Sequence, residues 1–173
     1  MAELPEPELR LNVLPLEAAS AALRRCCGAG RWVEAMLAQR PFASRSALLA
    51  TAAEVWANLG PADYLEAFAH HPEIGANLES LRDKFAGTAD WSGAEQSGAA
   101  NASEATLLAL RDGNATYRAR FGYSFIVCAT GKTAEEMLGL LRARIDHSPE
   151  QELAVAATEQ AQITRLRLEK LEP

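Results

Sequence analysis

The chain has 173 residues, of which 49% are hydrophobic, so it has enough apolar material for one domain with a buried core. Its formal net charge is −6, and no basic stripe is interleaved with aromatic residues, so we expect no nucleic-acid partner. No apolar run is long enough to cross a bilayer, and the first ten residues do not resemble a secretory signal. Three cysteines are a poor disulfide framework. These features predict a cytoplasmic protein with no membrane partner.

The first half of the chain contains four segments in which apolar residues recur at helical spacing: 16–27, 31–39, 44–59 and 61–70. Glycine and proline separate these segments, and Ser44 is a good N-cap for the third. The side chains that we expect to face the interior include Leu16, Leu23, Trp32, Met36, Leu48, Trp56, Leu65 and Phe68.

The second half is less regular before residue 103. Residues 76–90 only hint at a helix, another helix is expected near Ser92, and a longer one over 103–121. The run FIVCAT, 125–130, is short, apolar and β-branched, which predicts a short extended piece or a buried connection.

Two helices are expected after this run. The first begins at Thr133, and its interior positions are Met137, Leu140, Leu141 and Ile145. The second opens on the capping box Ser148–Pro149–Glu150–Gln151 and runs to about Leu171. The pattern as a whole predicts an all-α, single-domain bundle of about eight helices over residues 1–173, with 1–10 as a flexible extension.

Two adjacent histidines end the helix expected over 61–70. Because Pro72 disfavours the α region for the preceding residue, we expect the helix to end near His70 and His71 to be extended. The negative end of the helix dipole favours a protonated His71, poised as an acid or base near neutral pH. Simple capping of helix carbonyls is the alternative.

The sequence WSGAEQ, 91–96, is a second candidate. Ser92 and Glu95 have the spacing of a capping box, and capping alone would explain the pair. A helix N-terminus also offers free N–H groups to an anion, and Gln96 adds an amide.

The last helix carries two arginines. Arg165 leans toward solvent, whereas Arg167 lies four residues from both Ile163 and Leu171 on the apolar side. An arginine on that side needs an anionic partner, either a structural carboxylate or a substrate carboxylate.

Other chemistries have little support in the sequence. No spacing typical of a metal site is present, and ATGKT lacks the full spacing of a phosphate-binding loop. The helical pattern predicts that Cys26 and Cys27 lie in the core, and Cys128 lies in an apolar run. We therefore expect no metal.

Six motifs occur in order: CCGAGRWVEAM, RPF, HPEIG, WSGAEQSG, RFGYSFIVCATGKTAEEML and ITRLRLEKL. With them the chain resembles the 2-oxo-4-hydroxy-4-carboxy-5-ureidoimidazoline (OHCU) decarboxylase family from about Leu11 to Leu171. The resemblance implies an all-α homodimer without a metal or organic cofactor. It also implies release of CO2 from the ureidoimidazoline to give (S)-allantoin, the step after urate oxidase and 5-hydroxyisourate hydrolase.

The resemblance also assigns roles to particular residues. The catalytic histidine of the family, directly before proline, falls on His71, and Glu95 is the catalytic carboxylate. Arg167 matches the binding arginine of the last helix, with Arg165 as the alternative, and Ser124 stands where many relatives have proline. The remaining residues that the resemblance places against substrate are Pro72, Ser92, Gly93, Ala94, Gln96, Phe125, Ile126, Val127, Cys128 and Ala129.

The sequence is also compatible with two other functions. One is a different hydrolase of the ureide pathway, although such enzymes commonly need a metal cluster. The other is a non-enzymatic helical interaction module, for which His71, Glu95 and Arg167 need not converge on one pocket.

Overall fold

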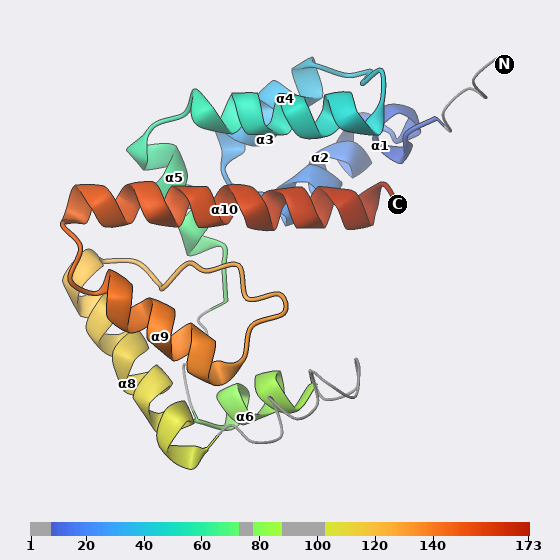
Figure 1. Cartoon of the computed structure of the whole chain (residues 1–173). Helices are drawn as coiled ribbons and strands as arrows, with labels where there is room; N and C mark the ends of the chain where they lie inside the picture. Colours follow the sequence, from blue (N-terminus) through green and yellow to red (C-terminus); the bar gives the residue numbers. More distant parts are fainter. Residues whose placement is uncertain (1–7, 73–77, 88–102) are drawn as a thin grey trace, which may run out of the picture. The chain divides into compact units, whose positions relative to one another are not determined.

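The computed structural model describes residues 8–72, 78–87 and 103–173. In these ranges it contains nine helices and no strand (Figure 1). The all-α prediction is confirmed, and the count is close to the eight helices expected. The helix expected near Ser92 lies outside the described residues, as does most of the expected flexible extension over 1–10. Of the helices in the described ranges, none combines the length and the apolar character needed to cross a membrane.

The chain forms two compact units, and the boundary between them falls at the two adjacent histidines. The first unit comprises Met1–His70 and Ala157–Pro173, and the second comprises His71–Ala156. The long final helix α10 (Pro149–Leu171) supplies its first residues to the second unit and the rest to the first.

The first unit contains five further helices, four of which match the segments expected from the sequence. A side-chain cap sets the N-terminal boundary of one of these helices: Ser44 Oγ accepts the N–H of Ala47 at 3.0 Å, as predicted. The short helix α1 was not predicted; the Glu172 carboxylate accepts the backbone N–H groups of Arg10 and Leu11 at 2.9 and 2.6 Å. These helices are α1 (Arg10–Val13), α2 (Leu16–Cys26), α3 (Gly30–Ala38), α4 (Arg45–Ala57) and α5 (Pro61–Ala69).

Large apolar side chains fill the interior of the first unit, and the two buried tryptophans donate their indole N–H groups to carbonyls. Trp32 Nε1 lies 3.2 Å from the oxygen of Ala52, and Trp56 Nε1 lies 3.0 Å from the oxygen of Ala157. Burial with a satisfied polar group is the usual arrangement for tryptophan. The fully buried side chains of this unit include Leu11, Leu23, Trp32, Met36, Leu48, Phe68 and Leu168.

Two residues expected in this core are exposed. Leu16 is 66% exposed because it is the first residue of α2, before the packed stripe begins. Leu65 is 45% exposed because it lies about 200° around α5 from the buried residues Asp63 and Ala67. Asp63 takes an interior position instead, where its carboxylate accepts from the N–H of Gly60 and from Arg31, each at 3.1 Å.

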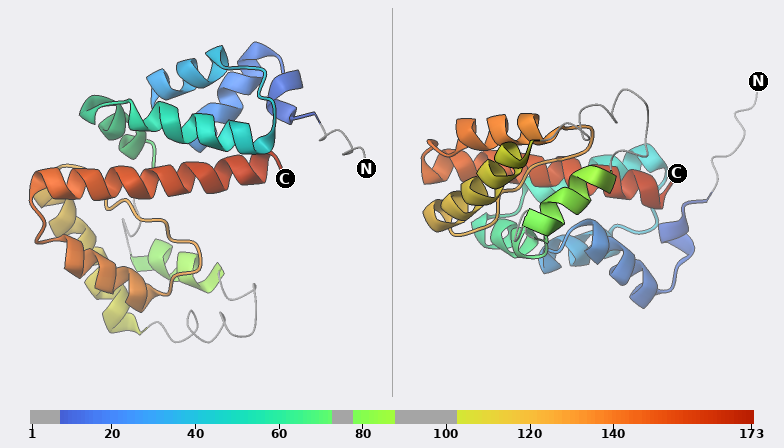
Figure 2. Two further views of the ribbon diagram at one scale, coloured as in Figure 1. Left: turned by 45° about the horizontal axis from the view of Figure 1, so that its top comes forward. Right: turned by 90° about the horizontal axis from the view of Figure 1, so that it is seen from below.

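The second unit is built on α6 (Leu78–Gly87), α8 (Glu104–Phe121), α9 (Ala134–Arg144) and the start of α10. Helix α9 lies along α8, as Figures 1 and 2 show, and α6 also contacts α8. The contact between α8 and α9 is close at Gly113, where a Cβ atom would fall 2.9 Å from Cδ2 of Leu141.

Caps define the helix boundaries of the second unit. Thr133 and Glu136 form a capping box, and the expected capping box between Ser148 and Gln151 is confirmed by reciprocal hydrogen bonds of 3.1 and 3.2 Å. Helix α8 ends at Gly122, whose φ of 85° is the left-handed conformation that favours glycine. Leu140, expected inside, is 36% exposed because it lies about 100° from Leu141, at the edge of the buried stripe of α9.

Candidate active site

The chain bends directly after α5, at the two histidines. His70 is the C-cap of α5, with φ −83° and ψ −6°, and its N–H donates to the oxygen of Ala67 at 3.2 Å. His71 follows in a bend and is half-buried, and Pro72 is exposed. The predicted end of the helix near His70 is therefore confirmed, and the catalytic role of His71 stays a prediction.

His70 packs against a glycine of its own unit. A Cβ atom added at Gly28 would lie 2.4 Å from Cγ and Cδ2 of His70 and 2.6 Å from its Cβ. Only a residue without a side chain fits beneath this histidine. His70 thus has a packing role in the first unit.

The second candidate segment, Ser92, Gly93, Ala94, Glu95 and Gln96, lies outside the described residues. Its expected capping box and its expected contacts with substrate both stay predictions.

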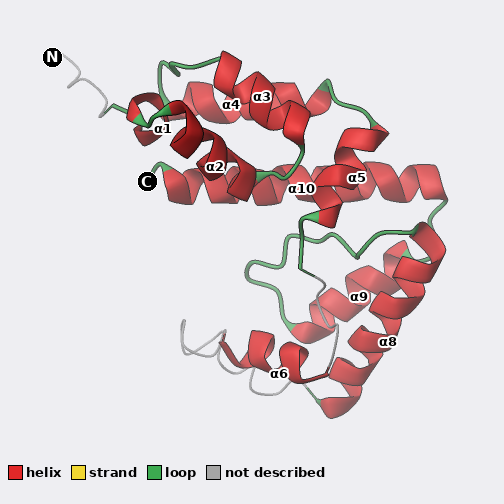
Figure 3. Ribbon diagram, turned by 180° about the vertical axis from the view of Figure 1, so that it is seen from behind, coloured by secondary structure: helices red, strands yellow, loops and turns green. Residues whose placement is uncertain are grey.

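The apolar segment Phe125–Ala129 connects α8 and α9 within the second unit, and Figure 3 shows it as a loop without a strand. The side chains of Phe125, Ile126, Val127 and Cys128 are all buried. Of the two structures that its composition allowed, the buried connection is the one observed. A buried connection needs partners for its backbone polar groups.

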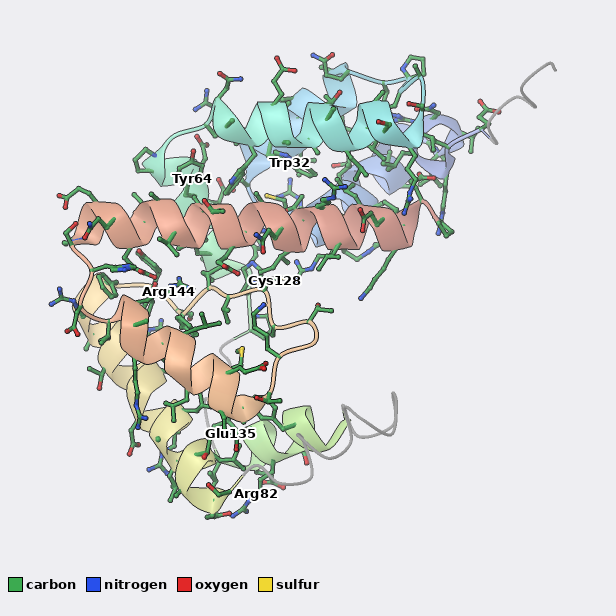
Figure 4. The ribbon with its side chains drawn as sticks, viewed as in Figure 1. Trp32, Tyr64, Arg82, Cys128, Glu135 and Arg144 are labelled. Carbon is green, nitrogen blue, oxygen red and sulfur yellow. The ribbon has the colours of Figure 1, made fainter. Side chains whose placement is uncertain are left out.

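Two cations supply such partners. Arg144 Nη1 donates to the carbonyl oxygen of Ile126 at 2.8 Å, and Lys132 Nζ donates to that of Cys128 at 2.6 Å. Arg144 stands near the C-terminal end of α9, while Cys128 lies on the connection itself (Figure 4). These bonds tie the segment to side chains that follow it in the sequence.

The position of Arg144 is fixed in turn by Glu152, which is fully buried. One oxygen of this carboxylate, Oε1, accepts from Nε and Nη2 of Arg144 at 2.8 and 2.5 Å and from the hydroxyl of Tyr117 at 2.5 Å. The other oxygen lies 2.9 Å from Nδ1 of His147. The Arg144 guanidinium also stands over the ring of Phe125, 4.6 Å from its centroid.

This buried network was not predicted from the sequence. Burial, followed by the hydrogen bond to Glu152, raises the pKa of Tyr117 above its ordinary value, so the phenol stays a donor. A signal was present: Arg144 stands three residues after Leu141 and seven after Met137, on the apolar stripe of its helix. Like Arg167, an arginine at this position needs an anionic partner.

The two arginines of the last helix lie in the first unit. Arg165 is 67% exposed and pairs with Glu169 at 3.1 Å, so its expected orientation toward solvent is confirmed. Arg167 is half-buried, and Nη1 donates to the carbonyl of Arg25 at 3.2 Å. Among the described residues Arg167 has no carboxylate partner, and its role toward substrate stays a prediction.

All three cysteines are reduced and buried, which confirms the core positions expected for Cys26 and Cys27. Burial raises the pKa of the Cys26 and Cys27 thiols to about 11, so both are protonated near neutral pH. In the described ranges no three histidine, cysteine, aspartate or glutamate side chains lie close enough together to hold a metal ion.

The chain matches one family model and several known proteins. The family model described as OHCU decarboxylase matches residues 12–169. A protein of Amia calva named 2-oxo-4-hydroxy-4-carboxy-5-ureidoimidazoline decarboxylase is 32% identical over 138 residues, which is 76% of this chain and 74% of that protein.

Two further proteins are similar. The uric acid degradation bifunctional protein TTL of Arabidopsis thaliana is 40% identical over 149 residues, or 84% of this chain; the match spans only 45% of that longer protein. A crystal structure of OHCU decarboxylase in the presence of (S)-allantoin has a TM-score of 0.70 and 34% identity, covering 86% of this chain and 94% of that one. The chain belongs to the OHCU decarboxylase family.

Proposed function

We propose that this chain is a carboxy-lyase that decarboxylates 2-oxo-4-hydroxy-4-carboxy-5-ureidoimidazoline to (S)-allantoin and CO2 in urate degradation, without a cofactor. The observation that carries the proposal is the family match, which extends over residues 12–169 and includes the histidine–proline motif. The similar crystal structure with (S)-allantoin supports the identity of the product.

The chemistry of the substrate sets three tasks. Loss of CO2 leaves an electron pair on a ring carbon, and the neighbouring carbonyl or imine of the ring takes up the charge. The enzyme must hold the C–CO2 bond perpendicular to the ring, stabilise the developing negative charge, and deliver a proton to one face. Because the heterocycle is its own electron sink, side chains and backbone groups suffice for these tasks.

Proton transfer falls to His71. It acts as general acid–base, either protonating the carbanionic carbon or relaying a proton from the hydroxyl, and such assistance is typically worth about 10²–10⁴ in rate. Its half-buried position just past a helix end supports this assignment. Glu95 orients His71 or accepts hydrogen bonds from N–H groups of the substrate.

The remaining groups hold the substrate. Ser92, Gln96 and the backbone of 125–129 fix the ring and the ureido group, and Pro72 contacts the substrate beside His71. Arg167 binds an anionic or carbonyl oxygen, which is supported by its freedom from any carboxylate partner among the described residues. Arg165 is the weaker candidate because Glu169 already pairs with it.

The setting of the enzyme is part of the proposal. It works in the cytoplasm as a homodimer and receives its substrate from 5-hydroxyisourate hydrolase, which follows urate oxidase. Light scattering on the protein as it elutes from a size-exclusion column tests the dimer. A mass near twice 18.6 kDa supports the dimer, and a mass near 18.6 kDa contradicts it.

The reaction itself is tested by making the substrate in situ with urate oxidase and the hydrolase, then measuring CO2, ammonia and urea. Faster CO2 release than in the enzyme-free control, with no ammonia or urea, is the expected result. Ammonia or urea production would instead indicate a ureide hydrolase. If the chain does not accelerate CO2 release at all, the non-enzymatic interaction module is the better interpretation.

A further inference from the structure

Two cations bind alternate carbonyls of the same buried segment in the second unit. Arg144 holds the oxygen of Ile126 and Lys132 holds that of Cys128, at 2.8 and 2.6 Å. Charge-assisted bonds of this kind are shorter and stronger than bonds between neutral groups. Both bonds are made to backbone carbonyl oxygens and not to side chains of the segment.

Each bound carbonyl belongs to a peptide group that also contains an N–H. The carbonyl of Ile126 shares its peptide group with the N–H of Val127, and that of Cys128 with the N–H of Ala129. A cation on the oxygen draws electron density from the amide, which makes the N–H a stronger donor. In a trans peptide group the N–H points away from the carbonyl oxygen, and so away from the cation.

Val127 and Ala129 are two residues apart, so their N–H groups are at most roughly 7 Å from each other. Within the described residues, neither N–H group has a hydrogen-bond partner. Val127 is buried, and a buried N–H without a partner is uncommon in folded proteins. Among the described residues, these two N–H groups are therefore left for a ligand with two acceptor oxygens.

We propose that Lys132 and Arg144 are positioning residues for the decarboxylation, because they orient and polarise the Val127 and Ala129 N–H groups toward two oxygens of the substrate. The ureidoimidazoline has such oxygens on its ring carbonyl and on its ureido carbonyl. Negative charge that spreads onto the ring carbonyl as CO2 leaves strengthens its bond to a polarised N–H. The inference rests on the proposed function.

Glu152 makes the Arg144 contact specific. By occupying Nε and Nη2 of the guanidinium, it leaves Nη1 directed at Ile126. Lys132 has no such support from a carboxylate in the described residues, and it is half-buried. It is therefore a better residue than Arg144 to substitute without damaging the core.

The test compares Lys132→Met, Lys132→Arg and, as control, Arg142→Met, which removes an exposed cation of α9. Each is assayed for kcat and KM with substrate made in situ, for thermal unfolding, and for the amide ¹⁵N and ¹H shifts of Ala129. We expect Lys132→Met to lower kcat about 5- to 50-fold with little change in KM, and to move the Ala129 amide shifts. Lys132→Arg restores both readouts in part, and Arg142→Met changes neither.

A merely structural role predicts a different set of results. If Lys132→Met lowers the unfolding temperature and its loss of kcat follows the unfolded fraction, the inference is wrong. It is also wrong if Lys132→Met keeps the wild-type kcat, or if Arg142→Met matches its loss. A wild-type chain without decarboxylase activity would overturn the proposed function itself, whereas an active wild type beside an equally active Lys132→Met overturns only this inference.

Discussion

The guanidinium of Arg144 and the carboxylate of Glu152 form a buried ion pair inside the second unit, with Nε and Nη2 2.8 and 2.5 Å from one carboxylate oxygen. The same carboxylate accepts from Tyr117 of α8, and Arg144 itself holds the carbonyl of Ile126. One ion pair thereby connects α8, α9, the start of α10 and the segment before α9. Its geometry determines where the backbone of that segment lies.

Removing the charge of Glu152 should be costly, because Arg144 would then remain buried without a counter-ion. We expect Glu152→Gln to lower the free energy of unfolding by about 3–5 kcal/mol. Tyr117→Phe removes one hydrogen bond and leaves the ion pair intact, so it should cost only about 1–2 kcal/mol. Urea unfolding of the two variants measures both values.

The exposed pair of Arg82 and Glu104 is the matched control, since both side chains are more than half exposed. Glu104→Gln should change stability by less than about 1 kcal/mol. If Glu152→Gln proved no more costly than Glu104→Gln, the buried pair would not have the organising role described above.

The two histidines should behave differently. His71→Asn should fold normally and lose most of its decarboxylase activity, by about 10²–10⁴-fold if proton transfer is its role. His70→Asn should keep most of the activity, because His70 caps α5 and packs on Gly28. Circular dichroism for folding and the coupled assay for activity check both variants; an inactive His70→Asn beside an active His71→Asn would reverse the assignment.

The contact between Gly28 and His70 is itself testable. A methyl group at Gly28 would lie within 2.6 Å of three His70 atoms, so Gly28→Ala should destabilise the protein by about 1–3 kcal/mol. His70→Gly removes all three atoms, so Gly28→Ala should cost less in that background. A double-mutant cycle by thermal unfolding measures the coupling, and equal costs in both backgrounds would exclude the contact as the cause.

The buried cysteines predict how stability changes at alkaline pH. Below pH 9, the ordinary pKa, the thiols of Cys26 and Cys27 are protonated in both the folded and the unfolded state, so they add no pH dependence. Above pH 9 the unfolded chain releases these protons while the folded chain retains them up to about pH 11, so stability falls as the pH rises.

Full titration would reduce stability by roughly 3 kcal/mol per thiol. Urea unfolding in a reducing buffer between pH 8 and 10 measures the slope. The double variant Cys26→Ala, Cys27→Ala is the control, and it should show a shallower slope whatever its stability at pH 8. An unchanged slope would mean that other groups cause the loss.

Features encoded locally in the sequence were predicted well. The N-cap Ser44, the capping box of Ser148 and Gln151, and the helix end before Pro72 each depend on residues at most three positions apart. Features that depend on distant partners were missed. Helix α1 rests on Glu172, about 160 residues away, and Tyr117 pairs with Glu152 across 35 residues.

The residues of the candidate site also differ in whether the sequence alone could identify them. His71 was singled out by its immediate neighbour Pro72, whereas the roles of Arg144 and Lys132 follow only from the carbonyls that they reach. The position of Arg144 on the apolar stripe of its helix indicated burial, but charged residues on a helix usually face solvent, and nothing local marked Glu152 as its buried partner. Arg167 was expected near the apolar side and is half-buried, but its observed partner is a backbone carbonyl, and a pattern of side chains cannot indicate such a partner.

The stereochemistry of the product tests the proposed function most directly. Urate oxidase and 5-hydroxyisourate hydrolase generate the substrate in the presence of this chain, and circular dichroism follows the allantoin that forms. We expect rapid accumulation of optically active (S)-allantoin, which is lost in His71→Asn. Racemic allantoin formed at the spontaneous rate would contradict the proposed function.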